Sequence, residues 1–78
     1  MNKTIEDFLK EVKESSSLKE KMISNFKNQE RKEIILNLFD LDFNFEKLQV
    51  TIFYYLLDNN YPPVTLTNKE FIELLQNS

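Results

Sequence analysis

The sequence predicts an all-α fold, a small bundle of four to five short helices in a single domain that spans residues 1–78. Apolar residues recur at helical spacing in several segments, and residues typical of helix starts precede them. The stretch from 39 to 57 holds six of the ten Phe and Tyr residues and is long enough for a central helix. The alternative is an α+β fold with a hairpin from 49–56 and 63–66.

The first two helices follow from capping residues and apolar spacing. The first is expected over about residues 5–14, after Thr4, and the second begins in the serine cluster, at a Ser17–Glu20 capping box or at Ser15. Their apolar positions recur every three or four residues. These positions are Ile5, Phe8, Leu9 and Val12 in the first helix, and Leu18, Met22, Ile23 and Phe26 in the second.

A third helix is expected over residues 30–39, with four apolar residues facing inward. These residues are Ile34, Ile35, Leu38 and Phe39. Arg31, Lys32 and Glu33 then form a solvated outer face. The connector 40–44 follows, and it presents large apolar residues between small polar ones.

The central helix is expected over residues 45–57, with Asn44 as its N-cap. On a helical wheel, only Lys47, Thr51 and Asp58 form a continuous polar strip, which predicts a helix buried among its neighbours. The segment 49–55 is also rich in β-branched and aromatic residues. With residues 64–66 it could instead form the hairpin of the alternative fold.

A proline pair ends the central element, because proline lacks the amide hydrogen and disfavours helix in the residue before it. Tyr61 stands before this pair on a loop, either as a lid over the core or as a recognition residue. Thr67 and Glu70 then form the clearest capping box in the chain. A last helix is predicted from there to about Gln76, with Phe71, Leu74 and Leu75 on its apolar side.

The composition excludes several classes of function. The chain has no Cys and no His, and it shows no motif for nucleophilic or acid–base catalysis, so we expect a non-enzyme without metal or cofactor. Ten basic and thirteen acidic residues give a net charge of −3, which argues against a nucleic-acid partner. No apolar run suits a membrane helix and the start does not resemble a secretory signal, so we expect a cytoplasmic protein that does not bind membranes.

Three segments carry a resemblance to a known family. FLKEVKESSSLKEKM at 8–22, LDFN at 41–44 and LTNKEFIELL at 66–75 resemble, in order and spacing, the Nif-eleven-type (nitrogen-fixation-related) leader peptide family. Asp40 stands in place of the family's central glycine, and Gln76 and Asn77 stand where its double-glycine cleavage site would be. The resemblance is therefore to a leader without that cleavage site or a core peptide. It implies a segment that a larger protein binds.

These observations predict a non-enzymatic protein-recognition module that resembles a modified-peptide leader and binds a larger protein partner. The expected contact surface combines the exposed connector with two nearby tyrosines: Leu41, Asp42, Phe43, Asn44, Tyr54 and Tyr61. The alternative is a small acidic inhibitor from a phage or mobile element, of the anti-CRISPR or antitoxin-like kind, that blocks a host protein. A central helix that is apolar on two sides would also suit a homodimer.

Overall fold

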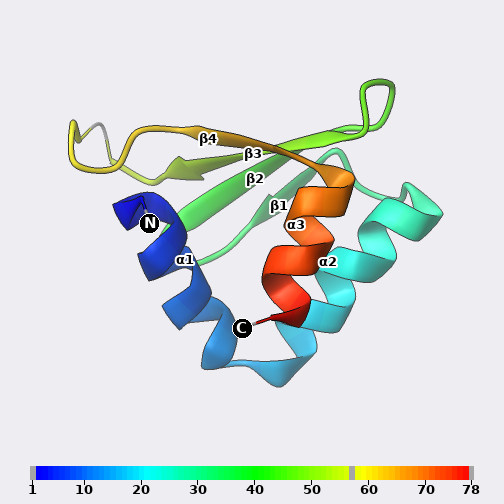
Figure 1. The fold of residues 1–78 in the computed structure, drawn as a ribbon, viewed down its shortest axis with the longest axis horizontal. Coiled ribbons are helices and arrows are strands. Elements are labelled where there is room, and N and C mark those ends of the chain that lie inside the picture. The colour runs from blue at the N-terminus through cyan, green and yellow to red at the C-terminus, as the bar shows by residue number, and fades with distance from the viewer. Residues whose placement is uncertain (1, 57, 78) are drawn as a thin grey trace.

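The chain folds into two layers, a four-stranded antiparallel sheet and three helices that all lie against one face of it (Figure 1). The computed structural model describes residues 2–56 and 58–77. The elements in chain order are α1 (Lys3–Lys13), α2 (Ser16–Asn28), β1 (Glu33–Ile35), β2 (Phe39–Asn44), β3 (Gln49–Tyr54), β4 (Val64–Thr67) and α3 (Asn68–Gln76). The fold is therefore α+β, and the predicted helical bundle is wrong.

Two predicted helices are strands in the structure. The segment 30–39 contains β1 and the first residue of β2, and the segment 45–57 contains a turn followed by β3. Residue 57 lies outside the described residues. β3 pairs antiparallel with β4, with Val50 opposite Leu66, so the hairpin of the alternative interpretation is confirmed. Aromatic and β-branched side chains suit the half-buried surface of a sheet, which explains why this segment prefers a strand.

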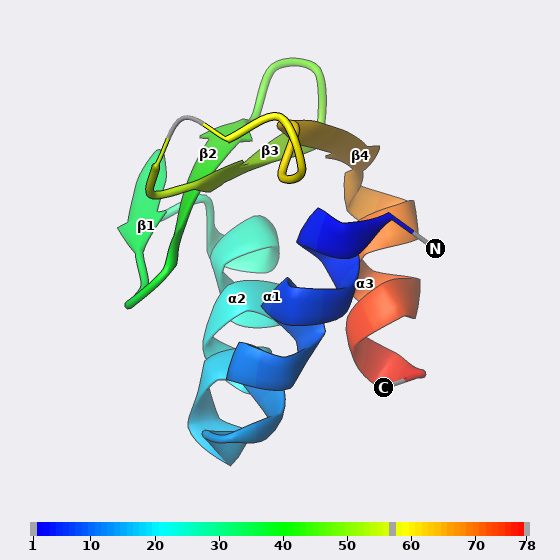
Figure 2. The ribbon, with the colours of Figure 1, turned by 90° about the vertical axis from the view of Figure 1, so that its left-hand side faces the viewer.

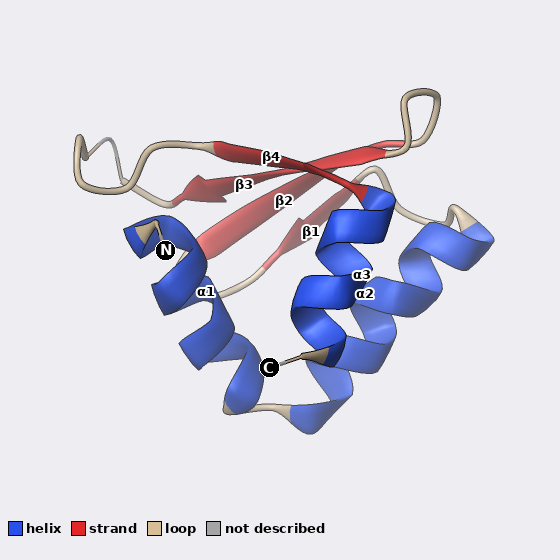
Figure 3. Ribbon diagram, in the orientation of Figure 1, coloured by secondary structure: helices blue, strands red, loops and turns tan. Residues whose placement is uncertain are grey.

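The sheet is a simple meander with the strand order β1-β2-β3-β4, and β1 and β4 form its edges (Figure 2). In β2, Phe39, Leu41 and Phe43 are buried and face the helices, while Asp40 and Asp42 alternate with them on the other face. The helices cover only the inner face, as the colouring by secondary structure makes plain (Figure 3). The outer face of the sheet is left bare.

Aromatic rings form the centre of the core between the sheet and the helices. Phe71 of α3 lies 5.6 Å from Phe26 of α2 and 6.0 Å from Phe8 of α1, measured between ring centroids. Phe8 also meets Phe39 of β2 edge to face at 5.9 Å. The fully or almost fully buried apolar residues are Ile5, Phe8, Val12, Met22, Phe26, Ile34, Phe39, Leu41, Phe43, Val50, Ile52, Phe71 and Leu75.

Three helices of the prediction are present, with local differences at their starts. Asn2, rather than Thr4, caps α1, and its side chain accepts a hydrogen bond from the amide of Ile5. Ser15 occupies the N-cap of α2. The predicted capping box of α3 is confirmed, because the Thr67 hydroxyl and the Glu70 carboxylate each accept from the other's backbone amide.

Buried polar side chains tie the helices to the loops of the sheet. The Thr4 hydroxyl donates to the Pro62 carbonyl at 2.9 Å, which holds the β3–β4 loop against α1. Asn25 bonds both the amide and the carbonyl of Arg31 and fixes the connection from α2 to β1. These contacts set the positions of the loops from which the candidate site is built. In the part of the chain that the structure describes, no helix has the length and apolar composition needed to cross a membrane.

Candidate functional site

Exposed apolar side chains gather at one end of the sheet. In the described part of the chain, six large apolar side chains are well exposed, and five of them lie at the end formed by the β1–β2 turn and the β3–β4 loop. We call these five the apolar rim: Ile35, Leu38, Phe53, Tyr55 and Leu56. The sixth, Leu48, lies in the β2–β3 turn at the other end.

Strand pairing brings the rim residues together. Ile35 and Phe53 both pair with Asp40, from opposite sides, so they point outward from the same row of the sheet. Only β2 lies between them, so Ile35 and Phe53 are roughly 10 Å apart. One step further along, the Leu38 carbonyl accepts a hydrogen bond from the Tyr55 amide at 2.9 Å. The rim is therefore a continuous feature of one sheet end rather than a set of scattered residues.

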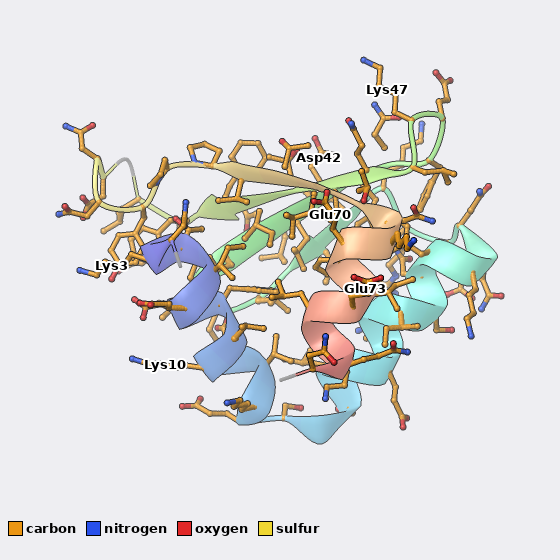
Figure 4. The ribbon with its side chains drawn as sticks, viewed as in Figure 1. Lys3, Lys10, Asp42, Lys47, Glu70 and Glu73 are labelled. Atoms are coloured by element: carbon orange, nitrogen blue, oxygen red, sulfur yellow. The ribbon has the colours of Figure 1, made fainter. Side chains whose placement is uncertain are left out.

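The β3–β4 loop extends the rim and is held against α1 by Tyr61. The Tyr61 ring stacks on Tyr54 with 4.1 Å between centroids and 13° between planes, and its hydroxyl donates to the Asp7 carboxylate at 2.6 Å. The Lys3 ammonium lies 5.0 Å from the centre of the same ring. Figure 4 shows Lys3 below this loop and Lys47 at the far end of the sheet, on the β2–β3 turn.

The hydrogen bond to Asp7 and partial burial raise the pKa of Tyr61 to about 12. The phenol therefore stays protonated and keeps donating to Asp7 throughout the neutral range. Burial raises the pKa of Tyr54 as well, and the neighbouring Tyr55 adds to the effect. Both tyrosines therefore line the loop as neutral side chains at neutral pH.

An open hollow lies between the rim and the loop, with a volume of about 390 Å³. Phe53, Leu56 and the Tyr54–Tyr61 pair supply its apolar surface, and Asp58 supplies a carboxylate. Its described lining offers aromatic faces and one acid but no nucleophile paired with a base. Such a hollow suits the binding of a side chain.

A second hollow, of about 630 Å³, lies beside the β1–β2 turn at the C-terminal end of α1. Glu11 and Glu14 line it together with Ile35 and Leu36. The Glu11 carboxylate also holds the turn in place, because its Oε1 accepts from the Leu38 amide at 3.0 Å. The rim thus has an apolar hollow on one side and an acidic hollow on the other.

The structure separates the six predicted contact residues. Leu41 and Phe43 are only 0% and 3% exposed and belong to the core, so the expectation of an exposed connector is wrong for both. Asp42 and Asn44 are exposed on the outer face of β2. Tyr54 and Tyr61 are brought into direct contact at the base of the β3–β4 loop, at the edge of the apolar rim.

The prediction from sequence missed most of the rim. The sequence predicts Ile35 and Leu38 on the inner side of a helix over 30–39. It predicts Phe53 and Tyr55 on a buried central helix. The signal that could have identified them is the strict alternation in FDLDFN at 39–44, which indicates a strand. Once that segment is a strand, its neighbours become strands too, and their outward apolar residues stand out.

The outer face of the sheet carries three acidic side chains, and the described helices do not cover it. Glu33 and Asp42 are directly opposite each other in the pairing of β1 with β2, and Asp40 is one row away. Like charges in this arrangement destabilise a sheet slightly. Within residues 2–56 and 58–77, no group of three or more acidic, His or Cys side chains is arranged to hold a metal ion.

Comparisons with known proteins do not assign this chain to a family. No family model matches it, and neither the curated proteins nor the solved structures contain a significant match.

Proposed function

We propose that this protein is a non-enzymatic recognition module that binds a larger protein through the apolar rim. The observation that carries the proposal is the gathering of five well-exposed large apolar side chains at one end of a bare sheet. Single exposed apolar residues are common, but a cluster of this kind in a small protein typically marks an interaction surface. The resemblance to leader peptides agrees with this role, since a leader acts by being bound.

Charge complementarity defines the kind of partner. Asp40 stands between Ile35 and Phe53 on the outer face, Asp58 lines the hollow beside the rim, and the chain as a whole carries a net charge of −3. An apolar surface surrounded by acids favours a partner that presents apolar side chains flanked by Lys or Arg. The proposed setting is the cytoplasm, which suits a chain without cysteine.

The acidic outer face favours a second candidate function, a small inhibitor that occupies a basic surface of a host protein. The observation behind it is the Glu33–Asp42 pair. These two acids lie directly opposite each other on neighbouring strands, and the sheet tolerates their repulsion. The two candidates differ in the result of binding. An inhibitor lowers the activity of the captured partner, whereas a recruitment module leaves that activity intact.

Capture from the native host with a matched control tests the rim. The tagged parent protein, a double variant Tyr55→Ser/Leu56→Ser and the control Leu48→Ser are expressed at native level, and the proteins that co-purify are quantified. We expect a partner that the parent and Leu48→Ser both retain and that the double variant loses. All three side chains are exposed, so none of the variants opens a cavity in the core. If the double variant retains the same partners as Leu48→Ser, the rim is not the binding surface.

A further inference from the structure

Glu11 is a buried carboxylate with one unsatisfied oxygen. The side chain lies in the last turn of α1 and is only 9% exposed. Its Oε1 accepts from the Leu38 amide, but its Oε2 has no hydrogen-bond partner in the described part of the chain. Buried polar atoms are nearly always paired, so an unpaired carboxylate oxygen indicates a donor that the described residues do not supply.

The surroundings of Glu11 favour a cationic donor. The hollow of about 630 Å³ beside it has Glu14 as a second carboxylate, and its described lining contains no Lys or Arg. It lies at the C-terminal end of α1, where the helix dipole adds partial negative charge. On the other side of Glu11, Lys10 is paired with Asp7 at 3.7 Å.

We propose that this acidic hollow receives an arginine side chain of the partner protein. The inference rests on the proposed function, because Ile35 belongs both to the apolar rim and to the wall of the hollow. A guanidinium presents several donors in one plane and can bond two acceptors at once, here Glu11 and Glu14. Its apolar stem then lies along Ile35 and Leu36.

Entry of the guanidinium moves the side chains that border the hollow. The Glu11 Oε2 atom is covered in the unbound protein, so its neighbours must shift before a donor reaches it. The Leu38 amide, bonded to the same carboxylate, is the most direct reporter of this change. Its NMR signal reports the state of Glu11 without any need for the natural partner.

The experiment uses the full chain labelled with ¹⁵N and two small probes, N-acetyl-arginine amide and N-acetyl-citrulline amide. The two have nearly the same shape, but citrulline carries no charge. We expect saturable shifts of the Leu38 and Asn37 amide signals with the arginine probe, in the millimolar range, and none with the citrulline probe. Equal responses to both probes, or no response to either, would overturn the inference.

Matched variants assign the response to Glu11. Glu11→Gln keeps an acceptor for the Leu38 amide but removes the charge, and we expect the arginine probe to bind about fivefold more weakly or worse. Glu14→Gln removes the exposed carboxylate of the hollow without touching that buried bond and is also expected to weaken binding. Glu30→Gln, in the connection between α2 and β1, removes the same charge elsewhere and should bind like the parent. Glu11→Gln and Glu14→Gln both binding as tightly as Glu30→Gln would contradict the proposal.

The probe experiment and the capture experiment fail independently. A partner captured through the rim, together with no response to arginine, overturns the arginine site alone. A response to arginine that depends on Glu11, with no partner lost from the rim variant, supports the site and overturns the proposed role of the rim.

Discussion

Replacing Gln29 or Leu48 with glycine is expected to stabilise the protein. Both residues have left-handed backbone conformations, with φ of 51° and 53°, and the chain contains no glycine to occupy such positions. Gln29 is the residue that ends α2, where glycine is the most common choice. The absence of glycine therefore leaves strain at two turns.

The size of the effect follows from two opposing terms. A left-handed conformation costs a residue with a Cβ atom about 1–2 kcal/mol, and glycine avoids that cost. Glycine also gives the unfolded chain more freedom, which removes about 0.5–1 kcal/mol of the gain. The net stabilisation is about 0.5–1 kcal/mol, or roughly 2–8 °C in Tm for a domain of this size. Gln29→Gly should gain more than Leu48→Gly, because the Leu48 side chain, although 44% exposed, still loses some apolar contact.

Thermal unfolding followed by far-UV circular dichroism measures the change, with Lys27→Gly as the control. Lys27 lies in the last turn of α2, where glycine costs about 1 kcal/mol of helix stability. The same new residue should thus raise Tm at position 29 and lower it two residues earlier. If Gln29→Gly lowers Tm as Lys27→Gly does, the left-handed conformation is not a source of strain and the reasoning is wrong.

Three further perturbations test the loop anchor, the α3 cap and the core. Tyr61→Phe removes the hydroxyl that donates to the Asp7 carboxylate of α1. The pKa of Tyr61 in the folded protein is about 12, above the ordinary 10.0. The parent should therefore have the higher urea midpoint by its full margin below pH 10, and the margin should shrink as the pH rises toward 12. An advantage that stays constant over this range would count against that bond. Thr67→Ala should lower the free energy of unfolding in urea by about 1 kcal/mol, because it removes the cap of α3. Glu70→Gln should be less stable than the parent above pH 4.5, and this difference should disappear as the pH falls through the lowered pKa of Glu70. A difference that does not change with pH would contradict the role of the carboxylate. Phe71→Ala should unfold the domain, since its cost of about 3–5 kcal/mol equals the stability expected for a single core this small. The control Phe53→Ala changes an exposed side chain and should stay folded. A well-dispersed NMR spectrum of Phe71→Ala would refute the assignment of the core.

The helices could be predicted from sequence because their signals are local. A capping residue, an apolar stripe and a chain break lie within a few residues of one another, as in the Thr67–Glu70 box that starts α3. The same holds for α1 and α2, whose predicted ranges agree with the structure except at their ends. No distant part of the chain is needed to recognise them.

The sequence predicts a helix in place of β3 because the outer face of this strand is not wholly polar. Val50, Ile52 and Tyr54 face the helices, but Phe53 adds an aromatic ring on the opposite face, next to Thr51. On a helical wheel such a segment looks apolar on every side except one narrow polar strip, as a buried helix does. Only the pairing partners β2 and β4, which are not visible locally, decide between the two.

The connector 40–44 illustrates how the error spread to the candidate site. With helices expected on both sides, its large residues are predicted to be exposed, yet Leu41 is 0% exposed in the structure. Ile35, expected to face inward from a helix, is 71% exposed. Core and surface were exchanged because strand pairing, rather than composition, determines which side of the sheet a residue occupies.

The functional site therefore becomes visible only after the strands are assigned correctly. In a sheet covered on one side, outward positions should be polar, and most of them are: Thr51 and Thr65 even share a hydrogen bond there, at 2.9 Å. Ile35 and Phe53 break this rule in one row, and Tyr55 lies just beyond the end of β3. Residues that depart from the local pattern without a gain in folding are the ones expected to act in binding. The apolar rim is identified by that departure, and the unpaired oxygen of Glu11 beside it is a departure of the same kind in the core.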